Sequence, residues 1–308
     1  MLLLVALAAG GCRLSPGRPP AKPAEAGAPP DLLGQEFRDI VYKQAGLPLH
    51  LDLYLPHAAV YPAAPVVVFM HGGSFVSGSK SDVNDVTSGP IKEHLRRHGF
   101  AVASVQYRLL DGERLFPVNI TDVRDAIRYL TAQAAHYGLD AARIATWGSS
   151  AGGTLALAAA YLEADLSPPD ETLAAYDPTI FAAIDVNGPT DLVRSLDPAE
   201  LNDGFSAYLR STPATFFGAA DPERLAAAVS PVRLAAAGAP PTLILHGTQD
   251  NVVDVSESER LAAVLQALDV PHRLFLLERA GHGLFPVDSR SSEAIRATVL
   301  DFLLDHLP

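Results

Sequence analysis

Cysteine is almost absent from this chain, because Cys12 is the single cysteine among 308 residues. One cysteine can form neither an intrachain disulfide nor a zinc site built from a cysteine cluster. The histidines show no spacing typical of a metal site. We therefore expect a protein that works without a metal ion.

Basic residues are also few. The chain has 23 lysines and arginines against 35 aspartates and glutamates, and its formal net charge is −12. Nucleic-acid binding depends on a basic surface that neutralises phosphates. The composition thus argues against a nucleic-acid partner.

Apolar residues are plentiful, at 48% of the chain, and only 19% of residues are charged. This composition predicts one domain with a sizeable core over residues 36–308. Within it, apolar runs with strand-like spacing alternate with segments of helical spacing. The expected strands are 37–42, 49–55, 66–70, 101–106, 143–147, 182–186, 242–246 and 273–277.

This alternation predicts an α/β fold with a mostly parallel central sheet and helices on both faces. Residues 163–178 and 195–231 show no such pattern. We predict that both are small irregular insertions over the carboxyl ends of the strands, where ligands bind in such folds.

The N-terminus has the pattern of an export signal. Residues 1–11 contain an apolar run that is too short to span a bilayer but has the length of a signal-peptide core. Small residues lead from it into Cys12, which resembles a bacterial lipobox. Residues 12–35 then form a linker rich in proline, alanine and glycine, a composition typical of an extended spacer. The sequence predicts a secreted or cell-envelope lipoprotein that contacts the membrane only through a lipid on Cys12. An ordinary secretory signal with an incidental cysteine is the alternative.

A serine between glycines stands out in the segment WGSSAGG, residues 147–153. Ser150 has glycines two positions before and after it, follows an expected strand and precedes an alanine-rich expected helix. This is the pattern of a nucleophile elbow, in which a strained turn exposes the serine Oγ at a helix N-terminus. Ser149 lacks this glycine spacing and is a weaker candidate.

A serine nucleophile needs a base and a group that orients the base. Asp250 follows the expected strand 242–246, and His282 follows the expected strand 273–277. Both residues therefore reach the same edge of a parallel sheet as Ser150, and the order Ser, Asp, His is that of an α/β-hydrolase triad. Asp254 is a weaker candidate for the acid, because it directly precedes an expected helix, where a carboxylate stabilises the helix start.

The segment HGGSF, residues 71–75, follows the expected strand 66–70. Consecutive glycines allow the backbone to approach a substrate and to direct N–H groups at one point. We predict an oxyanion hole formed by the N–H groups of Gly73, Ser74 and Ala151. His71 is expected to order this loop by hydrogen bonding.

These motifs together resemble those of the α/β-hydrolase esterases with an HGG oxyanion loop. The segments VVVFMHGGSFVSGSK (66–80), FPVNITDVRDAIRYL (116–130) and SPVRLAAAGAPPTLILHG (230–247) look most like bacterial carboxylesterases related to feruloyl and acetyl-xylan esterases. The resemblance implies hydrolysis of carboxylic esters without a cofactor and assigns the triad to Ser150, Asp250 and His282. Two positions depart from the family pattern: Ser74 replaces a third glycine, and Val253 replaces a proline.

The predicted function is therefore that of a serine esterase whose partner is a small-molecule or carbohydrate ester with a small acyl or hydroxycinnamoyl group. An amidase, formamidase or peptidase on the same scaffold is one alternative, and a non-catalytic surface-binding homologue is another. The sequence indicates no oligomeric state. The aromatic residues of the second insertion either line an acyl pocket or attach the insertion to the core; they are Phe205, Tyr208, Phe216 and Phe217.

Overall fold

The computed structural model describes residues 30–285 and 288–308. The predicted signal peptide, Cys12 and most of the predicted linker lie outside the described residues. Within the described part, no helix combines the length and apolar character that crossing a membrane requires.

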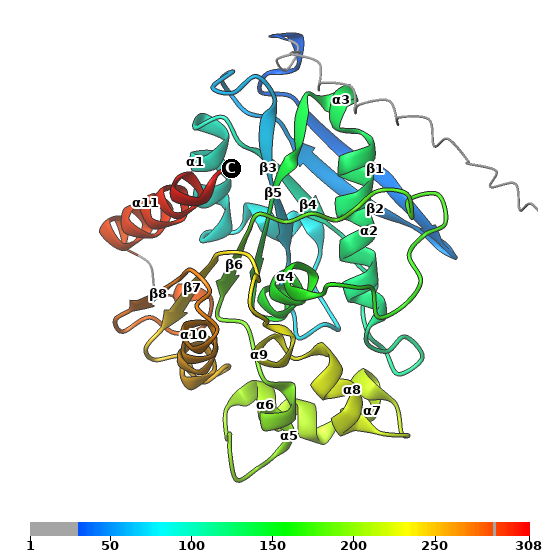
Figure 1. Cartoon of the computed structure of the whole chain (residues 1–308). Coiled ribbons are helices and arrows are strands. Elements are labelled where there is room, and N and C mark those ends of the chain that lie inside the picture. Colours follow the sequence, from blue (N-terminus) through cyan, green and yellow to red (C-terminus); the bar gives the residue numbers. More distant parts are fainter. Residues whose placement is uncertain (1–29, 286–287) are drawn as a thin grey trace, which may run out of the picture.

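An eight-stranded sheet organises the domain, with the strand order β1-β2-β4-β3-β5-β6-β7-β8 (Figure 1). The first two strands join the sheet through antiparallel pairs, and the remaining neighbours are parallel. The predicted fold class is thus confirmed. The strands are β1 (Glu36–Ala45), β2 (Leu47–Tyr54), β3 (Ala64–Met70), β4 (Ala101–Val105), β5 (Leu139–Ser149), β6 (Ala182–Val186), β7 (Thr242–Gly247) and β8 (His272–Leu277).

The apolar pattern of each strand explains its place in the sheet. β3 and β4 are buried along their whole length, as expected of parallel strands covered on both faces. β1 lies at the sheet edge, and most of its residues are exposed or only partly covered. Gly46 joins β1 to β2 with a φ of +82°, a conformation that glycine adopts without strain.

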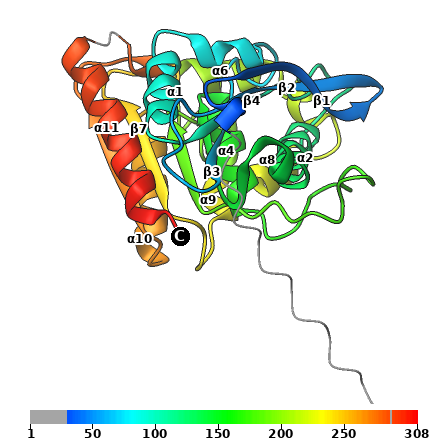
Figure 2. The same ribbon diagram turned by 90° about the horizontal axis from the view of Figure 1, so that it is seen from above.

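Helices cover both faces of this sheet. Helices α1 (Ser88–Arg97) and α11 (Ser289–His306) lie side by side on one face (Figure 2). Helices α2 (Val118–Ala132), α4 (Ala151–Tyr161) and α10 (Ser256–Ala267) pack on the other face. Short elements complete the domain: η1 (Pro30–Leu32), η2 (Lys80–Asn84), α3 (Ala134–Tyr137) and η3 (His282–Leu284).

The second predicted insertion is helical rather than irregular. It folds into short helices, several of which begin at an aspartate cap or at a proline in the first turn. The backbone N–H groups of Gly204 and Phe205 donate to the carbonyls of Asn251 and Val252, so the insertion does contact a loop at the carboxyl edge of the sheet. Figure 1 shows these helices grouped beyond that edge; they are α5 (Leu192–Leu196), α6 (Gly204–Ser211), α7 (Pro213–Phe217), α8 (Pro222–Val229) and α9 (Pro231–Leu234).

The first predicted insertion, residues 163–178, lies elsewhere than expected. Its Asp165 accepts hydrogen bonds from Arg124 and Arg128, so the segment packs along α2. It contributes no residue to the pocket that contains Ser150. The reason is topological: α4 returns from the carboxyl edge of the sheet, and a segment between α4 and β6 therefore starts near the opposite edge.

Candidate active site

Ser150 occupies a strained turn between β5 and α4. Its φ and ψ are +55° and −125°, and its N–H donates to the carbonyl of Val186 at 2.7 Å. A side chain has no room at the neighbouring glycines, since a Cβ on Gly148 would lie 2.0 Å from the carbonyl oxygen of Gly152. A Cβ on Gly152 would lie equally close to the carbonyl oxygen of Met70. The segment has the tight strand-to-helix turn that the glycine spacing predicts.

The HGG loop lies directly beside this turn. Three successive residues, Gly73, Ser74 and Phe75, have φ values of +104°, +52° and +66°. A Cβ on Gly72 would lie 3.2 Å from the Ser150 Cβ, which shows how closely the two backbones approach. Ala151 is buried at the start of α4, immediately after Ser150. The three predicted oxyanion donors thus belong to two adjoining segments.

His71 holds the start of the HGG loop, as predicted. Its ring stacks on Tyr107 with a centroid separation of 4.2 Å, and the Tyr107 hydroxyl donates to the His71 carbonyl at 2.7 Å. Burial lowers the pKa of the His71 imidazole. The side chain therefore acts as a neutral, buried hydrogen-bonding group.

Asp250 and His282 meet in the loops after β7 and β8. His282 Nδ1 lies 2.8 Å from Asp250 Oδ2, and the other carboxylate oxygen accepts the N–H groups of Val252 and Val253 at 2.8 and 3.0 Å. Burial alone would raise the pKa of Asp250, but hydrogen bonds from His246, His282 and the backbone outweigh it and hold this pKa well below its usual range. Asp250 is therefore an anion next to the His282 imidazole.

Sequence reasoning missed a third side chain on Asp250. Asn187 Nδ2 donates to Asp250 Oδ2 at 2.8 Å. Asn187 directly follows β6 with a φ of +54°, a conformation that asparagine tolerates better than most residues. An Asn-Gly pair after a parallel strand was the available signal, because such a pair must lie at the same sheet edge as the other site loops.

His246, at the end of β7, lies behind Asp250. Its side chain is fully buried, with Nδ1 2.7 Å from the Ser258 hydroxyl and Nε2 3.4 Å from Asp250 Oδ2. Burial opposes its charged form, but the contacts with Asp250 and the Val253 carbonyl raise its pKa overall. His246 thus adds a second histidine contact to the carboxylate, and it does not line the pocket that contains Ser150.

A pocket of about 380 Å³ unites these segments, and we call it the central pocket. Its lining includes the HGG loop, Ser149, Ser150 and His282. Asp82 in η2 and Asp85 just after η2 also line the central pocket. The central pocket therefore combines a serine, an imidazole held by a carboxylate and a loop of closely approaching backbone.

Asp254 and the aromatic residues of the second insertion lie outside the central pocket. Asp254 accepts the N–H of Ser256 at 2.9 Å, at the start of α10, as a helix-stabilising carboxylate would. Phe205, Phe216 and Phe217 are buried in the core, where Phe75 contacts Phe205 and Phe216. None of these aromatic residues lines the central pocket, so they attach the insertion to the core.

Among residues 30–285 and 288–308, no group of three or more His, Cys, Asp or Glu side chains could hold a metal ion. The described part of the chain therefore contains no such candidate metal site.

The BD-FAE family model matches residues 51–265, which include the HGG loop, Ser150 and Asp250. The chain belongs to this family. Among solved structures, esterase 2 of Thermogutta terrifontis is 28% identical with a TM-score of 0.70, covering 90% of this chain and 94% of that one. A carbohydrate esterase from gut microbiota is 25% identical with a TM-score of 0.72, covering 90% and 99%. The predicted resemblance of this BD-FAE member to α/β-hydrolase esterases is confirmed.

Curated relatives match smaller parts of longer proteins. Esterase LipC of Mycobacterium tuberculosis is 29% identical over 73% of this chain and 54% of the relative. The non-reducing polyketide synthase pkbA of Emericella nidulans is 34% identical over 46% of this chain and 6% of the relative. The chain therefore spans about half the length of the mycobacterial esterase and a small fraction of the fungal synthase.

Proposed function

We propose that this BD-FAE member is a carboxylic ester hydrolase that works through an acyl-enzyme on Ser150. The observation that carries the proposal is the central pocket, in which Ser150, His282 and the HGG loop face one space while Asp250 binds the far side of the His282 ring. The similarity to esterases of known structure supports the same reaction class.

In the proposed reaction, Ser150 Oγ attacks the ester carbonyl carbon while His282 Nε2 accepts its proton. The carbonyl oxygen becomes an oxyanion and accepts hydrogen bonds from the N–H groups of Gly73, Ser74 and Ala151. The bond to the alcohol oxygen then breaks, and His282 returns the proton to that oxygen. A water molecule then attacks the acyl-enzyme while His282 accepts its proton. The bond to Ser150 Oγ breaks, His282 returns the proton to Ser150, and the carboxylic acid is released.

Asp250 supports both steps because it is held as an anion. A carboxylate only accepts hydrogen bonds, so the proton of His282 stays on Nδ1 and leaves Nε2 free to act as the base. The negative charge also stabilises the imidazolium that forms when His282 takes the serine proton.

Esters of small acyl or hydroxycinnamoyl acids, including carbohydrate esters, are the proposed substrates. The carboxylates of Asp82 and Asp85 border the central pocket and can accept hydrogen bonds from the hydroxyl groups of a sugar. A solved neighbour described as a carbohydrate esterase supports this substrate class.

Covalent labelling by a fluorophosphonate tests the nucleophile. Esterase 2 of Thermogutta terrifontis, a structural neighbour of this chain, has been observed phosphonylated by sarin, so a related probe suits this test. We expect the wild type and Ser149→Ala to be labelled at one site and Ser150→Ala to remain unlabelled. An unlabelled wild-type protein, or labelling that survives in Ser150→Ala, would contradict the proposal.

We also propose that the domain is held at the cell envelope by a lipid on Cys12. The support is the apolar segment before Cys12 and the proline-rich linker after it. Metabolic labelling with a radioactive fatty acid should mark the wild type and leave Cys12→Ala unmarked. Equal labelling of the two proteins would exclude the anchor.

A further inference from the structure

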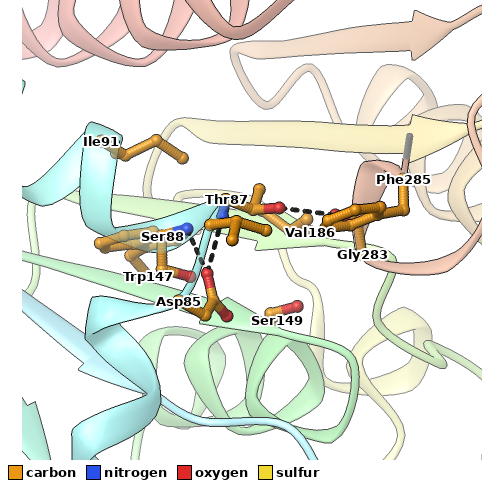
Figure 3. A pocket seen from close by; sticks show the side chains of 10 residues that line it. Asp85, Thr87, Ser88, Ile91, Trp147, Ser149, Val186, Gly283 and Phe285 are labelled. Atoms are coloured by element: carbon orange, nitrogen blue, oxygen red, sulfur yellow. Dashed lines mark hydrogen bonds between the residues drawn. The ribbon is translucent and has the colours of Figure 1, made fainter. Parts of the chain in front are cut away.

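A second, smaller hollow adjoins the central pocket. It has a volume of about 140 Å³, and we call it the side pocket (Figure 3). Ser149 and Asp85 line both pockets, so the two spaces adjoin at the residue that precedes Ser150. Figure 3 shows the side chains of Asp85 and Ser149 among those that line the side pocket.

Hydrogen bonds fix the walls of the side pocket. The Thr87 hydroxyl donates to the Gly283 carbonyl at 3.1 Å, which joins the segment before α1 to the loop that carries His282. Asp85 Oδ1 accepts the N–H groups of Thr87 and Ser88 at 2.9 and 2.6 Å. The side pocket is therefore a preformed space between two connected segments.

Its lining is largely apolar. Ile91, Trp147 and Val186 are buried residues from α1, β5 and β6 and form its inner part. Val86 and Phe285 lie at its solvent side, because they are partly exposed. The inner part of the side pocket favours a hydrocarbon group, because a sugar there would exchange water for contacts with the side chains of Ile91, Trp147 and Val186.

We propose that the side pocket binds the acyl group of the substrate and limits it to short chains. This inference rests on the proposed function. The oxyanion donors and His282 Nε2 must face the carbonyl oxygen and the alcohol oxygen, and the HGG loop and His282 line the central pocket. The acyl substituent is the remaining group on the carbonyl carbon, and the side pocket is the apolar space that shares Ser149 and Asp85 with the central pocket.

The volume decides which acyl groups fit. An apolar cavity of about 150 Å³ holds one benzene molecule. The side pocket, at about 140 Å³, thus has room for an acetyl, propionyl or butyryl group. A feruloyl group carries a propenoyl chain, a methoxy group and a hydroxyl group in addition to its ring, so it exceeds the volume of the side pocket and would extend out of it. Of the two acyl classes proposed above, the structure favours the small one.

Two series of esters test this assignment. The first series varies the acyl chain of p-nitrophenyl esters from acetate to butyrate and octanoate and adds p-nitrophenyl ferulate, so that the leaving group stays the same. The second series keeps the acetyl group and varies the alcohol. For the wild type we expect kcat/KM for the butyrate ester to exceed that for the octanoate and ferulate esters by about tenfold or more, because each misplaced methylene is worth about tenfold or more in such pockets.

Val86→Trp should narrow the side pocket without disturbing the core, because Val86 is 66% exposed. We expect the ratio of butyrate to acetate kcat/KM to fall about tenfold, with the alcohol series unchanged. Val60→Trp is the matched control, since Val60 is 54% exposed and does not line either pocket. Ile91→Ala should have the opposite effect and raise the octanoate to butyrate ratio about tenfold.

The outcomes separate the two proposals. If Val86→Trp changes the alcohol series instead of the acyl series, or changes neither, the acyl assignment is wrong although esterase activity stands. Efficient hydrolysis of p-nitrophenyl ferulate by the wild type would also overturn it. If the wild type hydrolyses no ester and reacts with no fluorophosphonate, the proposed function itself fails.

Discussion

Two halves of the candidate site are held in place by different interactions. Backbone conformation positions Ser150 and the HGG loop, because several residues there have positive φ and their glycines have no room for a side chain. Side-chain hydrogen bonds and charge position Asp250 and His282, because Asp250 receives donors from His282, Asn187 and two backbone N–H groups. The first half should therefore be sensitive to added volume, and the second to changes of charge or tautomer.

The largest effect is expected in the half that depends on charge. Asp250→Asn keeps the shape of the side chain but removes the anion that fixes the proton on His282 Nδ1. We expect kcat for p-nitrophenyl acetate to fall by about 10⁴, as in other serine hydrolases that lose this carboxylate. Thermal unfolding should show a folded protein. A loss below about tenfold would mean that Asp250 does not orient the base.

The buried carboxyl group of Asp185, on β6, should make the stability of the protein depend on pH. Burial raises the pKa of Asp185 to about 7, and one of its carboxyl oxygens has no hydrogen-bond partner. The folded state keeps this proton while the unfolded state loses it above about pH 4, so the free energy of unfolding should fall as pH rises from 4 to 7. Asp185→Asn removes this fall. Relative to wild type, the free energy of unfolding of the variant should increase by up to about 4 kcal/mol between pH 4 and pH 8. This upper limit corresponds to a pKa shift of about three units.

Urea unfolding at both pH values measures this difference. Asp301→Asn is the control, because Asp301 is an exposed residue on α11 and should change little between the two pH values. A constant difference between Asp185→Asn and wild type across the pH range would show that Asp185 is ionised in the folded state.

A smaller effect is expected in the half that depends on backbone approach. A Cβ on Gly72 would lie 3.1 Å from the Ser149 carbonyl oxygen and 3.2 Å from the Ser150 Cβ, so Gly72→Ala should displace the HGG loop from the elbow. We expect kcat to fall by about 10², comparable to the loss of one oxyanion donor. Gly89→Ala introduces a Cβ at a similar 3.3 Å, but against Asn84 near the start of α1, and should leave kcat unchanged. If the two variants have equal kcat, the close approach at Gly72 does not position the HGG loop for catalysis, and the distinction between the two halves of the site fails.

Much of this architecture could be predicted from the sequence. The apolar runs placed the buried strands within a few residues, since strands covered on both faces need continuous apolar side chains. The insertion 195–231 was wrongly expected to be irregular, although Asp203, Asp221 and the prolines after Thr212 and Asp221 are helix-start signals. Its short segments lack the repeated apolar spacing by which longer helices are found.

The sequence by itself determined the class of chemistry. The spacing of glycines around Ser150 and the position of Asp250 and His282 after strands are local features, and a parallel sheet brings the ends of its strands to one edge. Only the tertiary structure decided what surrounds them. Asn187 reaches Asp250 across 63 positions, and the side pocket is lined by residues from 85 to 285. Such contacts depend on the packing of distant segments, which no local pattern of residues encodes.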